Sequence, residues 1–135
     1  MDNLLLQLGI LLFLVGLLTG FVIPKLANPR MGLASHLEGV LNGLFLVALG
    51  LLWQRLNLSD GWLVVTFWLA VYGTFANWLA TLLAAVWGAG ALMPIAAMGH
   101  QGSSMQEGVV KFLLGTLSVS MIAVCVIVIV GLRAG

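Results

Sequence analysis

One charged side chain interrupts the stretch VVKFLLGTLSVSMIAVCVIVIVGL, residues 109–132, which is otherwise lipid-soluble along its whole length. A helix rises about 1.5 Å per residue, so about 20 apolar residues cross a hydrocarbon core of about 30 Å. Three further apolar runs precede this one. The sequence therefore predicts an all-α membrane protein, a bundle of four transmembrane helices at about 4–23, 33–54, 62–87 and 107–132 in a single domain, residues 1–135.

Composition supports this fold class. Hydrophobic residues make up 62% of the chain and charged residues 7%, whereas soluble domains carry about a quarter charged residues. The chain has no basic cluster that would indicate a nucleic-acid partner, and we expect none. We expect an integral protein of a bacterial-type inner (cytoplasmic) membrane, with the lipid bilayer as its surroundings.

The second predicted helix contains the polar stretch SHLEGVLNG, residues 35–43. Successive helical residues turn by about 100°, so Glu38 and Asn42 share one face. His36 points to roughly the opposite side, where Gly39 and Gly43 are its neighbours. The two polar features are thus predicted to face different directions.

Two interpretations of the glycines beside His36 remain open. Gly39 and Gly43 have the GxxxG spacing that lets helix backbones approach closely. A wall without side chains beside an imidazole also suits a haem, with His36 as the iron ligand.

Glu38 likewise has two interpretations. An ionisable side chain inside a span is a candidate functional group, here a proton donor hydrogen-bonded to Asn42. Alternatively, Glu38 pairs with Arg30 or Lys25, because it lies only about one turn from the predicted membrane boundary at residue 33.

The third predicted helix has a small, polar stripe that should face protein, because an unpartnered amide in hydrocarbon costs several kcal/mol. Asn77 in this stripe could bridge helices or orient a substrate, and Tyr72 on its flank offers a phenol donor. The members of the stripe are Thr66, Gly73, Asn77, Thr81 and Ala84.

The fourth predicted helix begins with Glu107, which precedes Lys111 by one turn and favours a same-helix ion pair. Lys111 also shares a stripe with Gly108, Gly115 and Ser118. If this stripe faces inward, as predicted, Lys111 could reach a cavity or a haem propionate.

Three stretches resemble the hydroxylaminobenzene mutase family: NPRMGLASHLEGVLNG (28–43), YGTFANW (72–78) and WGAGALMPIA (87–96). The family consists of small integral membrane enzymes, and the resemblance extends over nearly the whole chain. It implies isomerisation of a small aromatic hydroxylamine, hydroxylaminobenzene, to 2-aminophenol in nitroaromatic breakdown.

The mechanistic hypothesis joins the resemblance to the residues. His36 would ligate a b-type haem whose iron polarises the N–O bond, with Gly39, Gly43 and Lys111 around the cofactor. Proton transfer and substrate orientation would fall to Glu38, Asn42, Tyr72 and Asn77. An acid mechanism through Glu38 without a cofactor is the other route.

Two alternative functions remain at this point. One is a haem electron carrier with His36 and His100 as axial ligands, although His100 lies in a predicted loop. The other is a small proton-coupled exporter, whose working carboxylate would belong in the first helix, where none is found within the span. We also expect a homo-oligomer, because the small-residue faces exceed what one bundle can pair.

Overall fold

A computed structural model describes residues 1–133 of the chain, and the last two residues of the predicted domain, 134–135, lie outside it. The described part is helical and contains no strand, which confirms the predicted fold class. The elements are α1 (Asp2–Val22), η1 (Ile23–Lys25), α2 (Pro29–Leu52), η2 (Trp53–Arg55), α3 (Asp60–Trp87), α4 (Pro94–Ala97) and α5 (Ser104–Arg133).

The long helices begin before the predicted apolar runs, because their first turns are polar. In α2, Asn28 is the N-cap: its side chain accepts a hydrogen bond from the Met31 N–H at 3.2 Å, and Pro29 occupies the first turn. Helix α2 therefore starts at Pro29, one turn earlier than the predicted boundary at residue 33.

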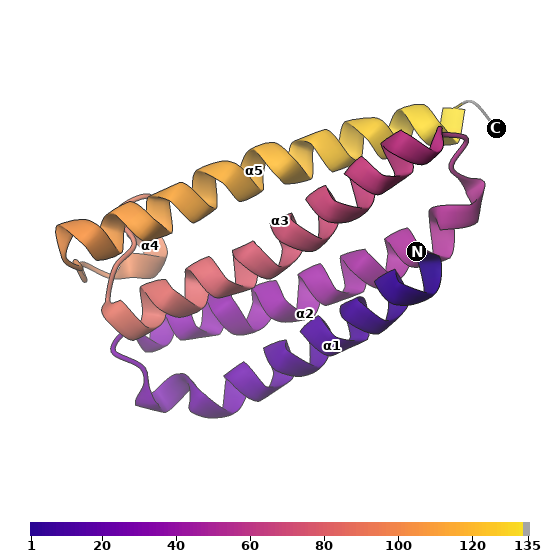
Figure 1. Cartoon of the computed structure of the whole chain (residues 1–135). Coiled ribbons are helices and arrows are strands. Elements are labelled where there is room, and N and C mark those ends of the chain that lie inside the picture. Colours follow the sequence, from indigo (N-terminus) through magenta and orange to yellow (C-terminus); the bar gives the residue numbers. More distant parts are fainter. Residues whose placement is uncertain (134–135) are drawn as a thin grey trace.

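The four long helices pack in chain order (Figure 1). Helix α1 lies along α2, α2 packs against α3, and α3 packs against α5, whereas α1 and α3 touch only slightly. The central helices are therefore the most buried. In the most apolar 18-residue stretch of α3, 44% of the residues are buried, against 17% in that of α5. Helix α5 leaves most of its surface without a partner inside the protomer.

Glycines bring α1 and α2 into backbone contact. A Cβ added to Gly16 would lie 2.6 Å from the Val40 nitrogen, and one added to Gly39 would lie 2.5 Å from the Gly16 Cα. Gly43 is equally close to Phe13 of α1, with a distance of 2.6 Å to its nitrogen. Helix α1 therefore fills the glycine groove of α2, as the packing interpretation predicts.

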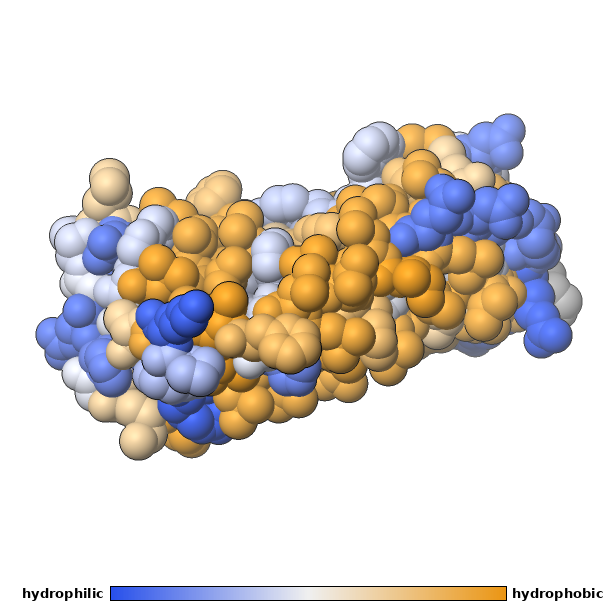
Figure 2. Space-filling view, turned by 90° about the horizontal axis from the view of Figure 1, so that it is seen from below, coloured by the Kyte–Doolittle hydropathy of each residue, from blue (hydrophilic) through white to orange (hydrophobic). Residues whose placement is uncertain are grey.

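The surface matches a membrane-spanning protein. Hydrophobic side chains cover the long middle of the molecule and hydrophilic ones gather toward its two ends (Figure 2). Four helices are long and apolar enough to cross a bilayer. The chain is an integral membrane protein.

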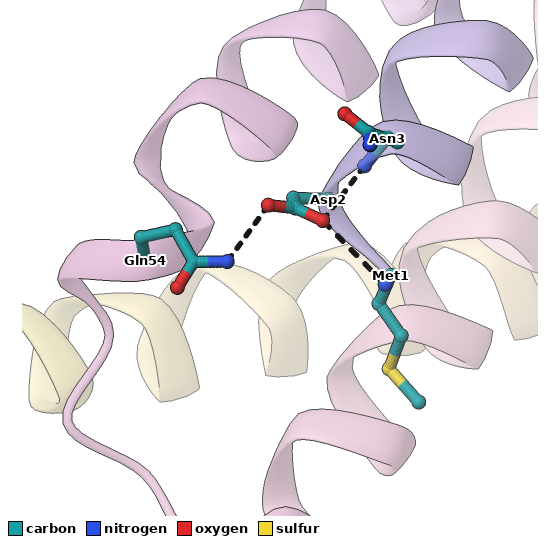
Figure 3. A network of polar contacts seen from close by, with 4 residues as sticks. All are labelled: Met1, Asp2, Asn3 and Gln54. Carbon is teal, nitrogen blue, oxygen red and sulfur yellow. Dashed lines mark hydrogen bonds and ion pairs between the residues drawn. The ribbon is translucent and has the colours of Figure 1, made fainter.

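At one end of the bundle, the start of α1 is tied to η2 (Figure 3). The Asp2 carboxylate accepts a hydrogen bond from the Gln54 side chain at 2.7 Å, and its other oxygen accepts one from the Asn3 N–H at 2.9 Å. The amino group of Met1 lies 3.6 Å from the same carboxylate. These contacts fix the register of α1 against α2.

At the other end, the Glu107 carboxylate organises the loop between α3 and α5. It accepts hydrogen bonds from the N–H groups of Gly90, Ala91 and Gly102 at 2.9–3.1 Å. The predicted ion pair with Lys111 is wrong: among residues 1–133 the one ion pair joins the N-terminus to Asp2. The loop folds back over the start of α5, so its N–H groups bind the Glu107 carboxylate in place of Lys111.

Candidate functional site

A polar cluster joins α2 to α3 inside the membrane-spanning region. The side-chain N–H₂ groups of Asn42 and Asn77 both donate to Oε2 of Glu38, at 2.9 Å and 2.8 Å. Asn42 also donates to the Glu38 backbone carbonyl at 2.8 Å. The predicted contact between Glu38 and Asn42 is confirmed, and so is the prediction that Asn77 bridges two helices.

Glu38 lies further from the start of its helix than predicted. It is about 14 Å along α2 from Pro29 at a rise of about 1.5 Å per residue, because α2 begins one turn early. Its carboxylate is half-buried and its partners are amides. The predicted pairing with Arg30 or Lys25 is therefore not what the structure shows.

The neighbouring turn of α3 is held by hydroxyl groups. Ser35 of α2 donates to the Trp78 carbonyl at 3.2 Å, and Thr81 donates to the Asn77 carbonyl at 2.9 Å. Asn77 is half-buried, and the rest of its predicted stripe is buried, which confirms that this face of α3 meets protein. The buried members are Thr66, Gly73, Thr81 and Ala84.

His36 is held on the other side of α2, against α1. Its Nδ1 lies 2.7 Å from the Gly16 carbonyl oxygen. A carbonyl only accepts hydrogen bonds, so Nδ1 carries the proton and the lone pair of the neutral ring is on Nε2. A Cβ added to Gly20 would lie 3.0 Å from Nδ1, so α1 also packs tightly against the ring.

The arrangement of His36 suits a metal ligand. A backbone carbonyl that accepts Nδ1–H fixes the tautomer and the ring orientation, and leaves Nε2 for a metal. Among the residues that the structure describes, no three His, Cys, Asp or Glu side chains come together to hold an ion. His36 has the geometry to serve as a single protein ligand, the arrangement that a haem iron uses.

Gly39 and Gly43 do not fit the same cofactor within this protomer. Their open side is occupied by the α1 backbone, as the 2.5–2.6 Å clearances show. A planar group on Nε2 of His36 would therefore lie outside the α1–α2 contact and not in the glycine groove.

Two other predicted residues lie away from the Glu38 cluster. Tyr72 is exposed, and its hydroxyl is hydrogen-bonded to that of Thr116 on α5. Lys111 is exposed too, and a Cβ on Gly108 or Gly115 would meet nothing within 4 Å. The prediction that this stripe of α5 faces inward is wrong, because α5 packs on α3 through a different face, with Val110 and Leu117 buried.

Sequence reasoning missed two contacts of α1, a helix to which it assigned no site residue. One is the Gly16 carbonyl that holds His36. The other is Thr19, whose hydroxyl accepts a hydrogen bond from the Trp78 indole N–H at 3.0 Å. Thr19 is one of two polar side chains within the predicted first span, which was the available signal, whereas a backbone carbonyl has none.

A separate pocket of about 440 Å³ lies in the loop before α5, lined by residues that include Pro94, His100 and Glu107. None of the predicted catalytic side chains lines it. Glu107 is already saturated by amide donors, and Nδ1 of His100 lies 2.9 Å from the Ala97 carbonyl oxygen. The polar side chains of this pocket therefore hold the loop together, and we assign it no step of the reaction.

Comparison with known proteins gives consistent matches. The family profile described as "SOI: Styrene oxide isomerase" matches residues 1–133. Hydroxylaminobenzene mutase HabB of Ectopseudomonas oleovorans is 63% identical over 131 residues, 96% of this chain and 80% of the relative. Hydroxylaminobenzene mutase HabA of the same organism is 52% identical over 125 residues, 92% of this chain and 93% of the relative. No solved structure matches the chain.

Proposed function

This chain belongs to the family described as styrene oxide isomerase, and we propose that it isomerises hydroxylaminobenzene to 2-aminophenol. The observation that supports this function is the high identity, over most of the chain, to two relatives named for the first compound. The chain is a membrane-embedded isomerase of the mutase class. The comparisons give no support to an electron carrier or an exporter.

The reaction moves one hydroxyl group. The N–O bond breaks, a C–O bond forms at the ortho carbon, and the proton lost from that carbon is balanced by one gained at nitrogen. Protonation of the hydroxyl oxygen weakens the N–O bond, and bulk water must not add to the resulting cation. A site between membrane helices excludes that water.

Glu38 is our candidate for the proton transfers. It is the carboxylate of the α2–α3 cluster, and Asn42 and Asn77 hold one of its oxygens. The two amides would fix the direction of the carboxylate and orient the polar group of the substrate. Tyr72 has a different partner, Thr116, and we assign it no step.

We further propose a b-type haem with His36 as the protein ligand of its iron. When bound, the haem iron would act as a Lewis acid on the hydroxylamino group. The support is the free Nε2 of His36, together with the Gly16 carbonyl that keeps the proton on Nδ1.

His36 and Glu38 face different neighbours, which bears on assembly. Within one protomer His36 contacts α1 and Glu38 contacts α3, so α2 separates them. A single small substrate meets both only if two protomers combine the two faces, and we therefore propose a homo-oligomer. The exposed surface of α5 is available for such contacts, and Lys111 on it is free to meet a propionate held by a neighbour.

We assign the protein to a bacterial-type inner membrane, because its spans are α-helical, whereas outer-membrane proteins of this kind are β-barrels.

The test is conversion of hydroxylaminobenzene by the detergent-purified protein, with 2-aminophenol measured by chromatography and the absorption spectrum recorded alongside. We expect activity and a Soret band in wild type, loss of both in His36→Ala, and retention of both in His100→Ala. A folded wild type that makes no 2-aminophenol refutes the function. Activity without a Soret band refutes the haem and leaves the chemistry to Glu38.

A further inference from the structure

We propose that Glu38 determines substrate specificity, by restricting the site to aromatic ligands that carry N–H or O–H donors beside the ring. The inference rests on the proposed function, because it concerns the ligand of the same cluster. It follows from a count of donors and acceptors in the hydrogen-bonded group of Glu38, Asn42 and Asn77.

The amide orientations are fixed by their partners. Asn42 donates to the backbone carbonyl and to Oε2 of Glu38, which are both acceptors, so both of its N–H bonds are used. Asn77 uses one N–H on the same Oε2 and keeps one. Among residues 1–133, Oε1 of Glu38 and the Oδ1 atoms of Asn42 and Asn77 have no hydrogen-bond partner. The cluster is left with three acceptor oxygens and one donor.

These oxygens are accessible. Within residues 1–133 no buried side-chain nitrogen or oxygen lacks a hydrogen-bond partner, so each of the three oxygens keeps some exposed area in the isolated protomer. The two helices that carry these oxygens are otherwise apolar, so a ligand that binds there has to supply the donors. While Glu38 is ionised, a molecule with several N–H and O–H groups fits this requirement, and a molecule with acceptors alone is repelled by its free carboxylate oxygen.

The compounds named for this family and its members differ in whether they carry N–H or O–H donors. Hydroxylaminobenzene has an N–H and an O–H, and 2-aminophenol has an amino group and an O–H. Styrene oxide, the compound in the family description, has only an acceptor oxygen, and so do nitroaromatic compounds. A carboxylate at position 38 therefore favours hydroxylamines over epoxides within one family fold.

An apolar seat for the ring lies further along the same face of α2. Phe45 is one turn beyond Asn42, and it lines a pocket of about 230 Å³ with Leu49 and Cys125. This pocket is partly open to the surface, and its volume exceeds that of a closed cavity of about 150 Å³ that binds benzene. A ligand could then place its N–H and O–H groups on the Glu38 cluster and its apolar ring against Phe45.

The experiment compares two ligands of similar size, 2-aminophenol with donors and nitrobenzene without. Affinities are measured by calorimetry on the protein in nanodiscs, with empty nanodiscs subtracted, so that no turnover is needed. In Glu38→Gln the free carboxylate oxygen becomes a donor group of the same shape. We expect the Kd of 2-aminophenol to rise about tenfold or more, while that of nitrobenzene stays equal or falls.

Glu107→Gln is the matched control. It makes the same chemical change in the loop between α3 and α5, and it should leave the ratio of the two affinities unchanged. Glu38→Met is a second variant that removes the carboxylate without adding a donor, and it should also weaken 2-aminophenol selectively. An unchanged ratio in both Glu38 variants overturns the proposal, as does equal loss of both ligands. A wild type that prefers 2-aminophenol but makes none from hydroxylaminobenzene would instead refute the proposed function.

Discussion

On the α1 side of α2 a backbone carbonyl holds His36, whereas on the α3 side two side-chain amides hold Glu38. The first arrangement depends on how closely two helices approach, because the Gly16 carbonyl cannot be replaced by mutation. The second depends on particular side chains, which can be removed one at a time. The two faces of α2 should therefore respond to different substitutions: the His36 face to changes in helix spacing, and the Glu38 face to changes of single side chains.

The largest expected effect is on activity, and it comes from a change on the Glu38 face that should leave the absorption spectrum of the His36 face unchanged. Glu38→Gln should reduce 2-aminophenol formation about 10²–10⁴-fold, the usual contribution of a positioned acid or base. Its Soret band should keep the wild-type position and intensity, because the His36 contact with α1 is untouched. Turnover and absorbance on the same purified sample check this. Loss of the band in Glu38→Gln would show that the two faces are not independent.

The next effect is confined to the His36 face. In Gly16→Ala the new methyl group would lie 2.6 Å from the Val40 nitrogen, and in Gly9→Ala it would lie 2.8 Å from the Val47 nitrogen. Both should destabilise the α1–α2 contact by about 1–3 kcal/mol through overpacking. Only Gly16→Ala places the clash at the residue whose carbonyl holds Nδ1 of His36.

Nitrogen-15 NMR of the imidazoles distinguishes these two variants. Wild type and Gly9→Ala should show His36 with its proton on Nδ1, and Gly16→Ala should show a mixture of tautomers. His100, whose Nδ1 lies 2.9 Å from the Ala97 carbonyl oxygen, serves as an internal reference. Equal spectra for the two alanine variants would mean that helix spacing in general, and not this carbonyl, sets the ring.

The comparison of the two faces also shows what the sequence can predict. Helical periodicity is enough to place Glu38 with Asn42 and to turn His36 away from them, because side-chain direction follows from spacing alone. It does not identify the helix that each face meets. Gly16 has no side chain to signal its role, so the partner of His36 could not be predicted.

Helix α5 illustrates the same limit. Gly108, Lys111 and Gly115 form a small-residue stripe, and such a stripe permits close packing without telling whether the partner is in the same chain or another. The boundaries of the helices were predicted late for a different reason. The first turn of α2 contains Pro29 and Arg30, which are ordinary at a helix start but absent from an apolar count.

A smaller effect tests the Glu38 face through its two amides. Asn77→Leu removes the bond between α3 and α2, and Asn42→Leu removes bonds that stay within α2. We expect Asn77→Leu to lower the free energy of unfolding by about 1–2 kcal/mol, as for interhelical hydrogen bonds in membranes. Asn42→Leu should cost less. Unfolding in mixed micelles measures both, and a larger loss for Asn42→Leu would contradict this account of the cluster.

The smallest expected effect concerns Tyr72, which belongs to neither face of α2. Its hydroxyl is hydrogen-bonded to Thr116 of α5 at the exposed surface, so Tyr72→Phe should cost about 0.6 kcal/mol of stability, the average for such bonds in a membrane protein. Activity should stay within about twofold of wild type, because no polar atom of the Glu38 cluster or of His36 contacts the phenol.

Thr116→Val provides the matched change on the partner helix. If the two hydroxyls act only on each other, the double variant should be no less stable than either single one, since each change already removes the whole bond. Unfolding of the three variants and their rates of 2-aminophenol formation are measured together. A loss of activity in Tyr72→Phe that Thr116→Val does not share would mean that the phenol acts on the substrate, from a surface that only a second protomer could bring to the Glu38 face.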